Sequence, residues 1–298
     1  MRGLQLLWRF GRPHTLVGTT LAVLGVYVLV ADQVADVGDR PGDLLCTLVA
    51  AWSVNVFITG VNQLQDVEID RINKPQLPIA AGDLSPRAGA RIVVLSAVLP
   101  LVLALTQGAV EVTAVAVGLL VGVAYSLPPL RLKRWPALAA LSISGVRSLV
   151  VNLGVAAHFS LSLTGDVVIP DGVWMLAAFV APFGIAIALL KDVPDIEGDR
   201  RYRIATYSVR LGGAVVLRAG LALLAAAYVG IAVAAPLLLD GWAAAFLAAA
   251  HLAALAALLV AARRTDVTDR VRFTGFYLFV WRLFFLEYVI VPLAWLLA

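Results

Sequence analysis

The sequence contains a single cysteine, Cys46, among its 298 residues. One thiol cannot form a disulfide within the chain, and it also excludes a metal site built from several cysteines. Charge is scarce as well, because only 14% of the residues are Asp, Glu, Lys or Arg whereas 61% are hydrophobic. Soluble globular domains carry about 25% charged residues. The composition therefore excludes an ordinary soluble domain and predicts a polytopic membrane protein.

The N-terminus lacks the features of a cleaved targeting sequence. Residues 1–13 are short and basic, and the apolar run after them has no A-x-A cleavage pattern near its end. We therefore expect a protein of the bacterial plasma membrane. No low-complexity or linker segment divides the chain, so we expect one transmembrane domain over residues 1–298, with the lipid bilayer around it and neither nucleic acid nor an obligate protein partner.

Long apolar runs occupy most of the chain. A hydrocarbon core of about 30 Å requires about 20 apolar helical residues, and proline and glycine separate the runs. The pattern predicts an all-α polytopic protein with a single bundle of about nine transmembrane helices. The expected spans are 14–31, 44–64, 89–107, 110–127, 135–160, 173–190, 213–239, 242–262 and 275–297.

The basic residues indicate how the bundle is oriented. In this nine-span arrangement, 21 of the 23 Lys and Arg residues lie on one side of the bundle, at the N-terminus or in and next to the loops after the second, fourth, sixth and eighth expected spans. Arg40 lies on the opposite side, and Arg147 falls inside a span. Because basic loops stay in the cytoplasm, we expect a cytoplasmic N-terminus.

Two acidic segments follow the second and sixth expected spans, on the basic side. DVEIDR covers residues 66–71 and DIEGDR covers residues 195–200, so the two share the pattern D-[VI]-E-x-D-R. Asn62, Asp66 and Asp70 are four residues apart, which would place them on one face of a helix. Asp192 and Asp199 would share a face in the same way. The similarity suggests an internal repeat.

These residue types suit a metal-bound diphosphate. Carboxylates bind Mg²⁺, often together with substrate phosphate oxygens, and nearby basic groups can hold the remaining phosphate charge. Since the segments open onto apolar helices, the expected ligand is a diphosphate with a long hydrocarbon tail. The basic candidates are Arg71, Arg131, Lys133, Lys191 and Arg200, and Tyr125 lies close to them.

Simpler interpretations remain open at this stage. The acids could be solvated loop residues that balance Arg71 and Lys74, and we expect Glu68 and Glu197 to be solvated. Intramembrane acids also mark ion-coupled transporters. A transporter, however, would place its acids near the middle of the bilayer, whereas these acids lie at one edge beside basic residues, which favours an enzyme.

Arg147 is predicted to lie deep in the fifth span, where an unpaired charge is costly. It could form an ion pair with Glu287 of the ninth span, or it could bind the carboxylate of a substrate. Ser148 and Asn152 share a helix face, and they could orient a substrate or merely form hydrogen bonds between helices. His251, alone in an Ala- and Leu-rich span, is expected to be structural.

Six blocks of the sequence, taken together, resemble the UbiA superfamily of intramembrane prenyltransferases and, within it, the homogentisate prenyltransferases. The blocks cover nearly the whole chain. They are LWRFGRPHTLVGT (7–19), NQLQDVEIDRINKPQLPIAAG (62–82), AYSLPPLRLKR (124–134), VRSLVVNLGVAAHF (146–159), KDVPDIEGDRRYRIATYSVRLG (191–212) and FYLFVWRLFFLEYVIVPL (276–293).

The resemblance implies an enzyme that transfers an isoprenyl group from its diphosphate to a ring carbon of a small phenolic acid. It implies two Mg²⁺ ions, held by Asn62, Asp66, Asp70, Asp192, Asp195 and Asp199, with the aspartates of the two motifs as catalytic residues. A membrane terpene cyclase of the same superfamily is the alternative. Gln63 and the basic segment 201–206 depart from the broader pattern, which puts the identity of the acceptor in doubt.

Overall fold

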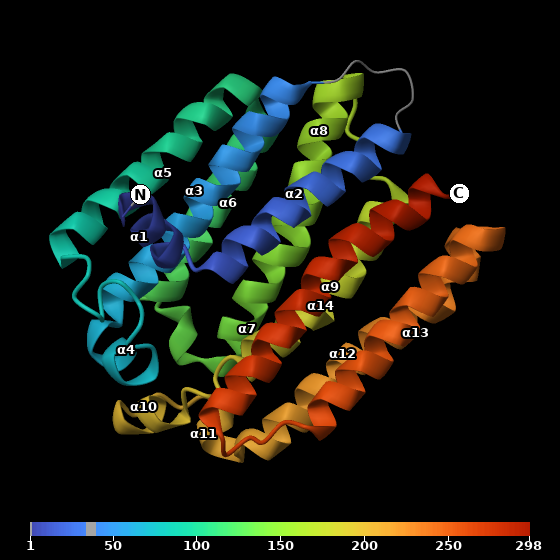
Figure 1. Cartoon of the computed structure of the whole chain (residues 1–298). Coiled ribbons are helices and arrows are strands. Elements are labelled where there is room, and N and C mark those ends of the chain that lie inside the picture. Colours follow the sequence, from blue (N-terminus) through green and yellow to red (C-terminus); the bar gives the residue numbers. More distant parts are fainter. Residues whose placement is uncertain (1, 34–39) are drawn as a thin grey trace.

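The computed structural model describes residues 2–33 and 40–298. Within these residues the chain is helical, and nine helices are long and apolar enough to cross a membrane. Figure 1 shows them packed as one bundle. The elements are α1 (Arg2–Phe10), α2 (Pro13–Gln33), α3 (Pro41–Gln65), α4 (Val67–Asn73), α5 (Pro86–Gln107), α6 (Ala109–Ser126), η1 (Leu132–Arg134), α7 (Pro136–Gly145), η2 (Val146–Gly154), α8 (Val155–Thr164), α9 (Asp171–Leu190), α10 (Ile196–Arg201), α11 (Tyr207–Leu211), α12 (Gly213–Leu238), α13 (Gly241–Arg263) and α14 (Arg270–Leu296).

The predicted fold class is confirmed, and the nine expected spans coincide with the nine long helices to within a few residues. The fifth span is a composite, because α7, η2 and α8 follow one another without a break over Pro136–Thr164. Its middle segment, η2, has π-helical hydrogen bonding. Such segments are uncommon and often lie at functional sites, and this one carries Arg147.

The buried side chains form two groups. The larger joins α2, α8, α9, α12, α13 and α14, and the smaller joins α1, α3, α5 and α6. Helices in a membrane associate through close packing rather than through the hydrophobic effect. At Gly60 of α3, for example, an added Cβ atom would lie 2.6 Å from Val93 of α5 and 2.8 Å from Phe10 of α1. The hydrogen atom of glycine therefore permits this three-helix contact.

The short helices gather at one end of the bundle. Figure 1 shows α4, α10 and α11 at the same end, where α3 and α9 finish and α14 begins. Proline and polar residues stop the long helices there, and the chain turns before the next span. The arrangement brings the two acidic segments, which are far apart in the sequence, to one side of the bundle.

Candidate active site

A cavity of about 1640 Å³ lies between α2, α3, α6, the composite fifth span, α9 and α14. At the end that carries the short helices, its walls hold both acidic segments and many basic side chains. Further into the bundle the walls are mainly apolar, with residues such as Ala51, Val54, Ile58, Val121 and Val150. The cavity therefore offers a charged mouth and an apolar interior.

The first acidic segment does not continue the helix before it. α3 ends at Gln65, Asp66 adopts a non-helical conformation, and α4 begins at Val67. The expectation of one continuous helical face for Asn62, Asp66 and Asp70 was therefore wrong, because the backbone turns at Asp66. All three residues nevertheless line the cavity.

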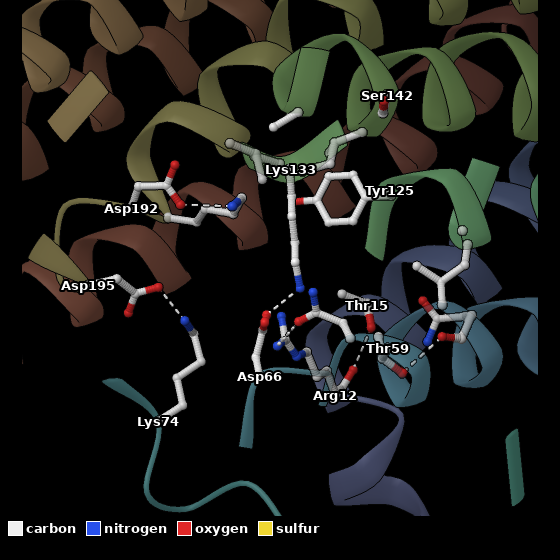
Figure 2. Close-up of a pocket in the computed structure, with 18 of the residues that line it drawn as sticks. Arg12, Thr15, Thr59, Asp66, Lys74, Tyr125, Lys133, Ser142, Asp192 and Asp195 are labelled. Carbon is white, nitrogen blue, oxygen red and sulfur yellow. Dashed lines mark hydrogen bonds and ion pairs between the residues drawn. The ribbon is translucent and has the colours of Figure 1, made fainter. Parts of the chain in front are cut away.

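Asp66 is held by two basic residues from the loop after α6. Lys133 Nζ lies 2.5 Å from Asp66 Oδ2, and an Arg131 Nη2 donates to Asp66 Oδ1 at 3.2 Å. Figure 2 shows Lys133 extended toward Asp66, with Tyr125 beside it. Both side chains line the cavity beside the first acidic segment, and their contact with a bound diphosphate stays a prediction.

The second acidic segment also turns between its acids. α9 ends at Leu190 and α10 begins at Ile196, so Asp192 and Asp199 do not share a continuous helix as expected. The Lys191 Nζ atom donates to Asp192 Oδ1 at 2.7 Å, and Lys74 forms an ion pair with Asp195. Figure 2 shows Lys74 reaching across from the other segment. Each of these acids therefore faces a cation.

The two segments are equivalent in local structure. Asp66 and Asp195 directly precede short helices, and Asp70 and Asp199 lie in the first turns of those helices. Their sequences differ where Ile69 of the first corresponds to Gly198 of the second. An added Cβ atom at Gly198 would lie only 2.2 Å from Asn73 Oδ1, so the close approach of α10 to α4 requires glycine there.

Asn73 links α4 to α10 through both polar atoms of its side chain. Its Nδ2 atom donates to Asp199 Oδ1 at 3.1 Å, and its Oδ1 atom accepts from the backbone N–H of Gly198 at 3.1 Å. The sequence analysis did not identify Asn73, and it considered Lys74 only as a loop charge that the acids could balance. Their position directly after the first motif was the available signal.

Burial alters the protonation of two of the acids. Burial raises the pKa of Asp70 from the usual 3.8 to about 6. Burial, together with the negative charges of Asp192 and Asp195, raises the pKa of Asp199 to about 7. Asp70 Oδ2 is buried and has no hydrogen-bond partner within the described residues. Burial destabilises the ionised form of these acids, and a nearby divalent cation would stabilise that form. Carboxylate oxygens are also the ligands that suit Mg²⁺.

Three arginines at the cavity have a positive φ angle. Arg12 has φ 58°, Arg131 has φ 39° and Arg203 has φ 55°, and all three line the cavity. Residues other than glycine adopt this conformation at an energetic cost, and such residues cluster at functional sites. The basic candidates of the sequence analysis included neither Arg12 nor Arg203, because neither side chain belongs to an acidic motif.

Arg147 does not form the ion pair with Glu287 that was one expectation. Glu287 instead lies 3.0 Å from His251 Nε2, and both of these side chains are fully buried. The guanidinium carbon of Arg147 lies 4.6 Å from the centre of the Trp281 ring. Within the described residues, Arg147 has neither an ion-pair partner nor a hydrogen-bond partner, and it lines the cavity.

Three other expected substrate-binding residues lie elsewhere. Arg71 pairs with Glu68 at 2.7 Å on the exposed side of α4, and Arg200 is exposed on α10. The prediction that Arg71 and Arg200 face the substrate was wrong, because the turns before α4 and α10 rotate these helices so that both side chains point away from the cavity. Asn152 is buried and accepts a hydrogen bond from the Tyr288 hydroxyl at 3.0 Å. None of the three lines the cavity, so Asn152 joins two helices, as its simpler interpretation held.

Comparison with known proteins gives consistent results. The model of the UbiA prenyltransferase family matches residues 16–283. Homogentisate phytyltransferase from Synechocystis sp. is 42% identical, with 99% of this chain and 97% of that protein covered. Homogentisate phytyltransferase 1 from Arabidopsis thaliana is 36% identical, with 97% and 75% covered.

Solved structures share the fold at low sequence identity. A UbiA homolog from Archaeoglobus fulgidus, bound to GPP and Mg²⁺, superposes with a TM-score of 0.66 at 18% identity. The alignment covers 96% of this chain and 99% of that one. A UbiA homolog from Aeropyrum pernix K1 gives a TM-score of 0.67 at 18% identity, with 96% and 98% covered.

Proposed function

Because the chain belongs to the UbiA prenyltransferase family, we propose that it transfers the isoprenyl group of a prenyl diphosphate to a ring carbon of homogentisate or a similar phenolic acid. The relatives named for homogentisate prenylation match nearly the whole chain. The observation that carries the proposal is the cavity itself, which combines a charged mouth, an apolar interior and an unpaired arginine.

The diphosphate would bind at the mouth between the two acidic segments. Asn62, Asp66, Asp70, Asp195 and Asp199 would hold two Mg²⁺ ions, with Asp192 beside them. The bound ions would neutralise the charge that develops on the departing diphosphate. The cations that line the same part of the cavity would stabilise that charge further. They are Arg12, Lys74, Arg131, Lys133, Lys191 and Arg203.

The phenolic acid would bind deeper, against Arg147. A carboxylate that enters an apolar bundle needs a cation, and Arg147 is poised on the Trp281 ring without a protein partner among the described residues. The His14 ring packs edge-on against the same tryptophan, with ring centres 4.9 Å apart. Arg147 and His14 thus present a cation and an imidazole to one stretch of the cavity, which suits an acid that also carries a hydroxyl group.

The proposed reaction forms one carbon–carbon bond. The bond between the first prenyl carbon and the diphosphate oxygen breaks, and diphosphate leaves with the electron pair. The electron-rich ring carbon of the acceptor then bonds to that prenyl carbon, and the ring loses the proton from the same carbon. An arylacetic acid such as homogentisate can also lose its side-chain carboxylate as carbon dioxide, with a proton taken up by the remaining methylene carbon. The apolar walls exclude water that would otherwise capture the allylic cation. A terpene cyclase would have no use for Arg147, so this residue favours the aromatic acceptor.

The test uses purified protein in lipid nanodiscs. Geranylgeranyl diphosphate, Mg²⁺ and homogentisate should yield a prenylated aromatic product, whereas a cyclic terpene formed without acceptor would indicate the cyclase. Asp66→Asn and Asp195→Asn should each abolish turnover. The exposed neighbour Glu197, which does not line the cavity, provides a matched control, because Glu197→Gln should retain activity. Normal turnover by both aspartate variants would contradict the proposed metal site.

A further inference from the structure

The cavity continues from the charged mouth to the opposite end of the bundle. Its lining includes one face of α6 from Tyr125 back to Glu111 and one face of α3 from Asn62 back to Thr47. Figure 1 shows that α3 and α6 both begin at the end away from α4 and α10. The path along α6 covers about 14 residues, or about 21 Å at 1.5 Å per residue.

The walls along the α6 side of this path are mainly apolar. Gly118 and Gly122 of α6 line it together with Ala114, Val115 and Val121. An added Cβ atom at Gly122 would lie 2.8 Å from the Ile58 side chain of α3, and one at Gly118 would lie 3.1 Å from Val54. The two glycines therefore permit the close approach of α3 and α6 beside the path, and a large side chain at either position would have to displace α3 or enter the path.

The far end of the path is polar. Glu111 is buried, with 3% exposure, and it has no basic partner within the described residues. Thr47, also buried, donates a hydrogen bond to Gln107 Oε1 at 3.2 Å. A carboxyl group buried in a membrane bundle is costly, and it gains nothing from contact with hydrocarbon. A hydrocarbon chain that reached this point would contact a polar surface, and that contact is unfavourable.

We propose that the path along α3 and α6 holds the prenyl tail of the substrate. Glu111 and Thr47 close this path and set the length of the prenyl tail that the enzyme accepts. This inference rests on the proposed function, because it assigns the tail of the diphosphate substrate to the same cavity. An isoprene unit contributes four carbons to the main chain and advances an extended chain by roughly 5 Å, given carbon–carbon bonds of about 1.5 Å. The path of about 21 Å therefore holds about four units, which is the geranylgeranyl class.

The test measures binding rather than turnover, so that it does not depend on the acceptor. Non-reactive thiolodiphosphate analogues with geranyl, farnesyl, geranylgeranyl and geranylfarnesyl chains are titrated into the full-length protein in nanodiscs with Mg²⁺. Affinity should rise up to the geranylgeranyl analogue and fall about tenfold for the geranylfarnesyl analogue, since each added group must fit a closed apolar pocket.

Variants at the two ends of the path test each step. Glu111→Leu should bind the geranylfarnesyl analogue about tenfold more tightly than wild type does, whereas Glu111→Gln should keep the wild-type order. Gly118→Leu should weaken the binding of the geranylgeranyl analogue at least tenfold. The affinity for the geranyl analogue should stay within about twofold of the wild-type value. Val117→Leu, at a neighbouring residue that faces out of the bundle, is its matched control.

One outcome would overturn the inference. If folded Glu111→Leu and Gly118→Leu proteins keep the wild-type order of chain lengths, the tail leaves the bundle sideways into the bilayer. A failure of the proposed function is distinguishable, because the protein would then bind the analogues but form no product with any phenolic acid.

Discussion

A hydrogen bond of 3.1 Å joins Asn73 Nδ2 to Asp199 Oδ1, two residues that lie 126 positions apart in the sequence, and connects α4 to the second acidic segment. The ion pair between Lys74 and Asp195 makes a second connection between the same segments. The two halves of the proposed metal site are therefore fixed relative to each other by the two residues that follow the first segment, Asn73 and Lys74, and not by the metal ions alone.

Gly198→Ala should disrupt this connection. The new methyl group would lie 2.2 Å from Asn73 Oδ1, so the asparagine must move and release Asp199. We expect at least a tenfold loss of kcat/KM, because a small misplacement of catalytic groups is costly. Gly230→Ala is the matched control, since nothing lies within 4 Å of an added Cβ atom there. Equal kinetics for the two variants, measured on folded protein, would contradict this role of Asn73.

The stability of the metal-free protein should fall as the pH rises. Asp70 and Asp199 have folded-state pKa values of about 6 and about 7, above the usual 3.8. The folded protein therefore binds protons more tightly than the unfolded chain does, and this contribution is lost as the pH rises through those values. Thermal unfolding of metal-free protein in detergent should show a lower midpoint at pH 8 than at pH 5.

Mg²⁺ should reverse that trend, because it binds the ionised carboxylates. A concentration about 100 times the dissociation constant adds about 2.7 kcal/mol, so the unfolding midpoint should rise by several degrees at pH 8. At pH 5 protons compete for the same oxygens, and the rise should be much smaller. A Mg²⁺ effect of equal size at both pH values would argue against binding by these two acids.

The sequence predicted the membrane fold and most acidic residues of the site, because hydropathy and the repeated D-x-E-x-D pattern are local signals. It predicted only some of the basic side chains that face the cavity: Arg131, Lys133, Arg147 and Lys191 line it, whereas Arg71 and Arg200 do not. Arg71 and Lys74 lie three residues apart, yet only Lys74 reaches the second motif, because Lys74 lies beyond the end of α4 with a non-helical backbone (φ −144°). Arg203 enters the cavity through a positive φ angle, which no periodic pattern reveals.

Labelling of single cysteines should test the orientation of the bundle. The exposed residues Asp166 and Asp266 lie in loops at opposite ends of the bundle, and the basic loops predict that Asp266 faces the cytoplasm. In a Cys46→Ser background, which removes the native thiol, a membrane-impermeant reagent added to intact cells should label Asp166→Cys. It should label Asp266→Cys only after the cells are broken. The opposite pattern would reverse the predicted topology.

Arg147 should determine how tightly the aromatic acid binds. A charge-assisted hydrogen bond contributes about 1.5–3 kcal/mol, so Arg147→Ala should raise KM for the acid by about 10- to 100-fold. The KM for the prenyl diphosphate should change little. The variant should also lose the preference for acids over matching phenols that lack a carboxyl group. Unchanged kinetics with the acid, in a stably folded Arg147→Ala protein, would exclude the acceptor role.

Because Glu287 pairs with His251, the role of Arg147 can also be tested by measurements of protein stability. Because these two buried side chains interact at 3.0 Å, the effects of His251→Ala and Glu287→Ala on the free energy of unfolding should not add, with a coupling of about 0.5–3 kcal/mol. The effects of Arg147→Ala and Glu287→Ala should add, because Arg147 stacks on Trp281 instead. A large coupling between Arg147 and Glu287 would show that the two residues form an ion pair. Arg147 would then not be free to bind the acceptor.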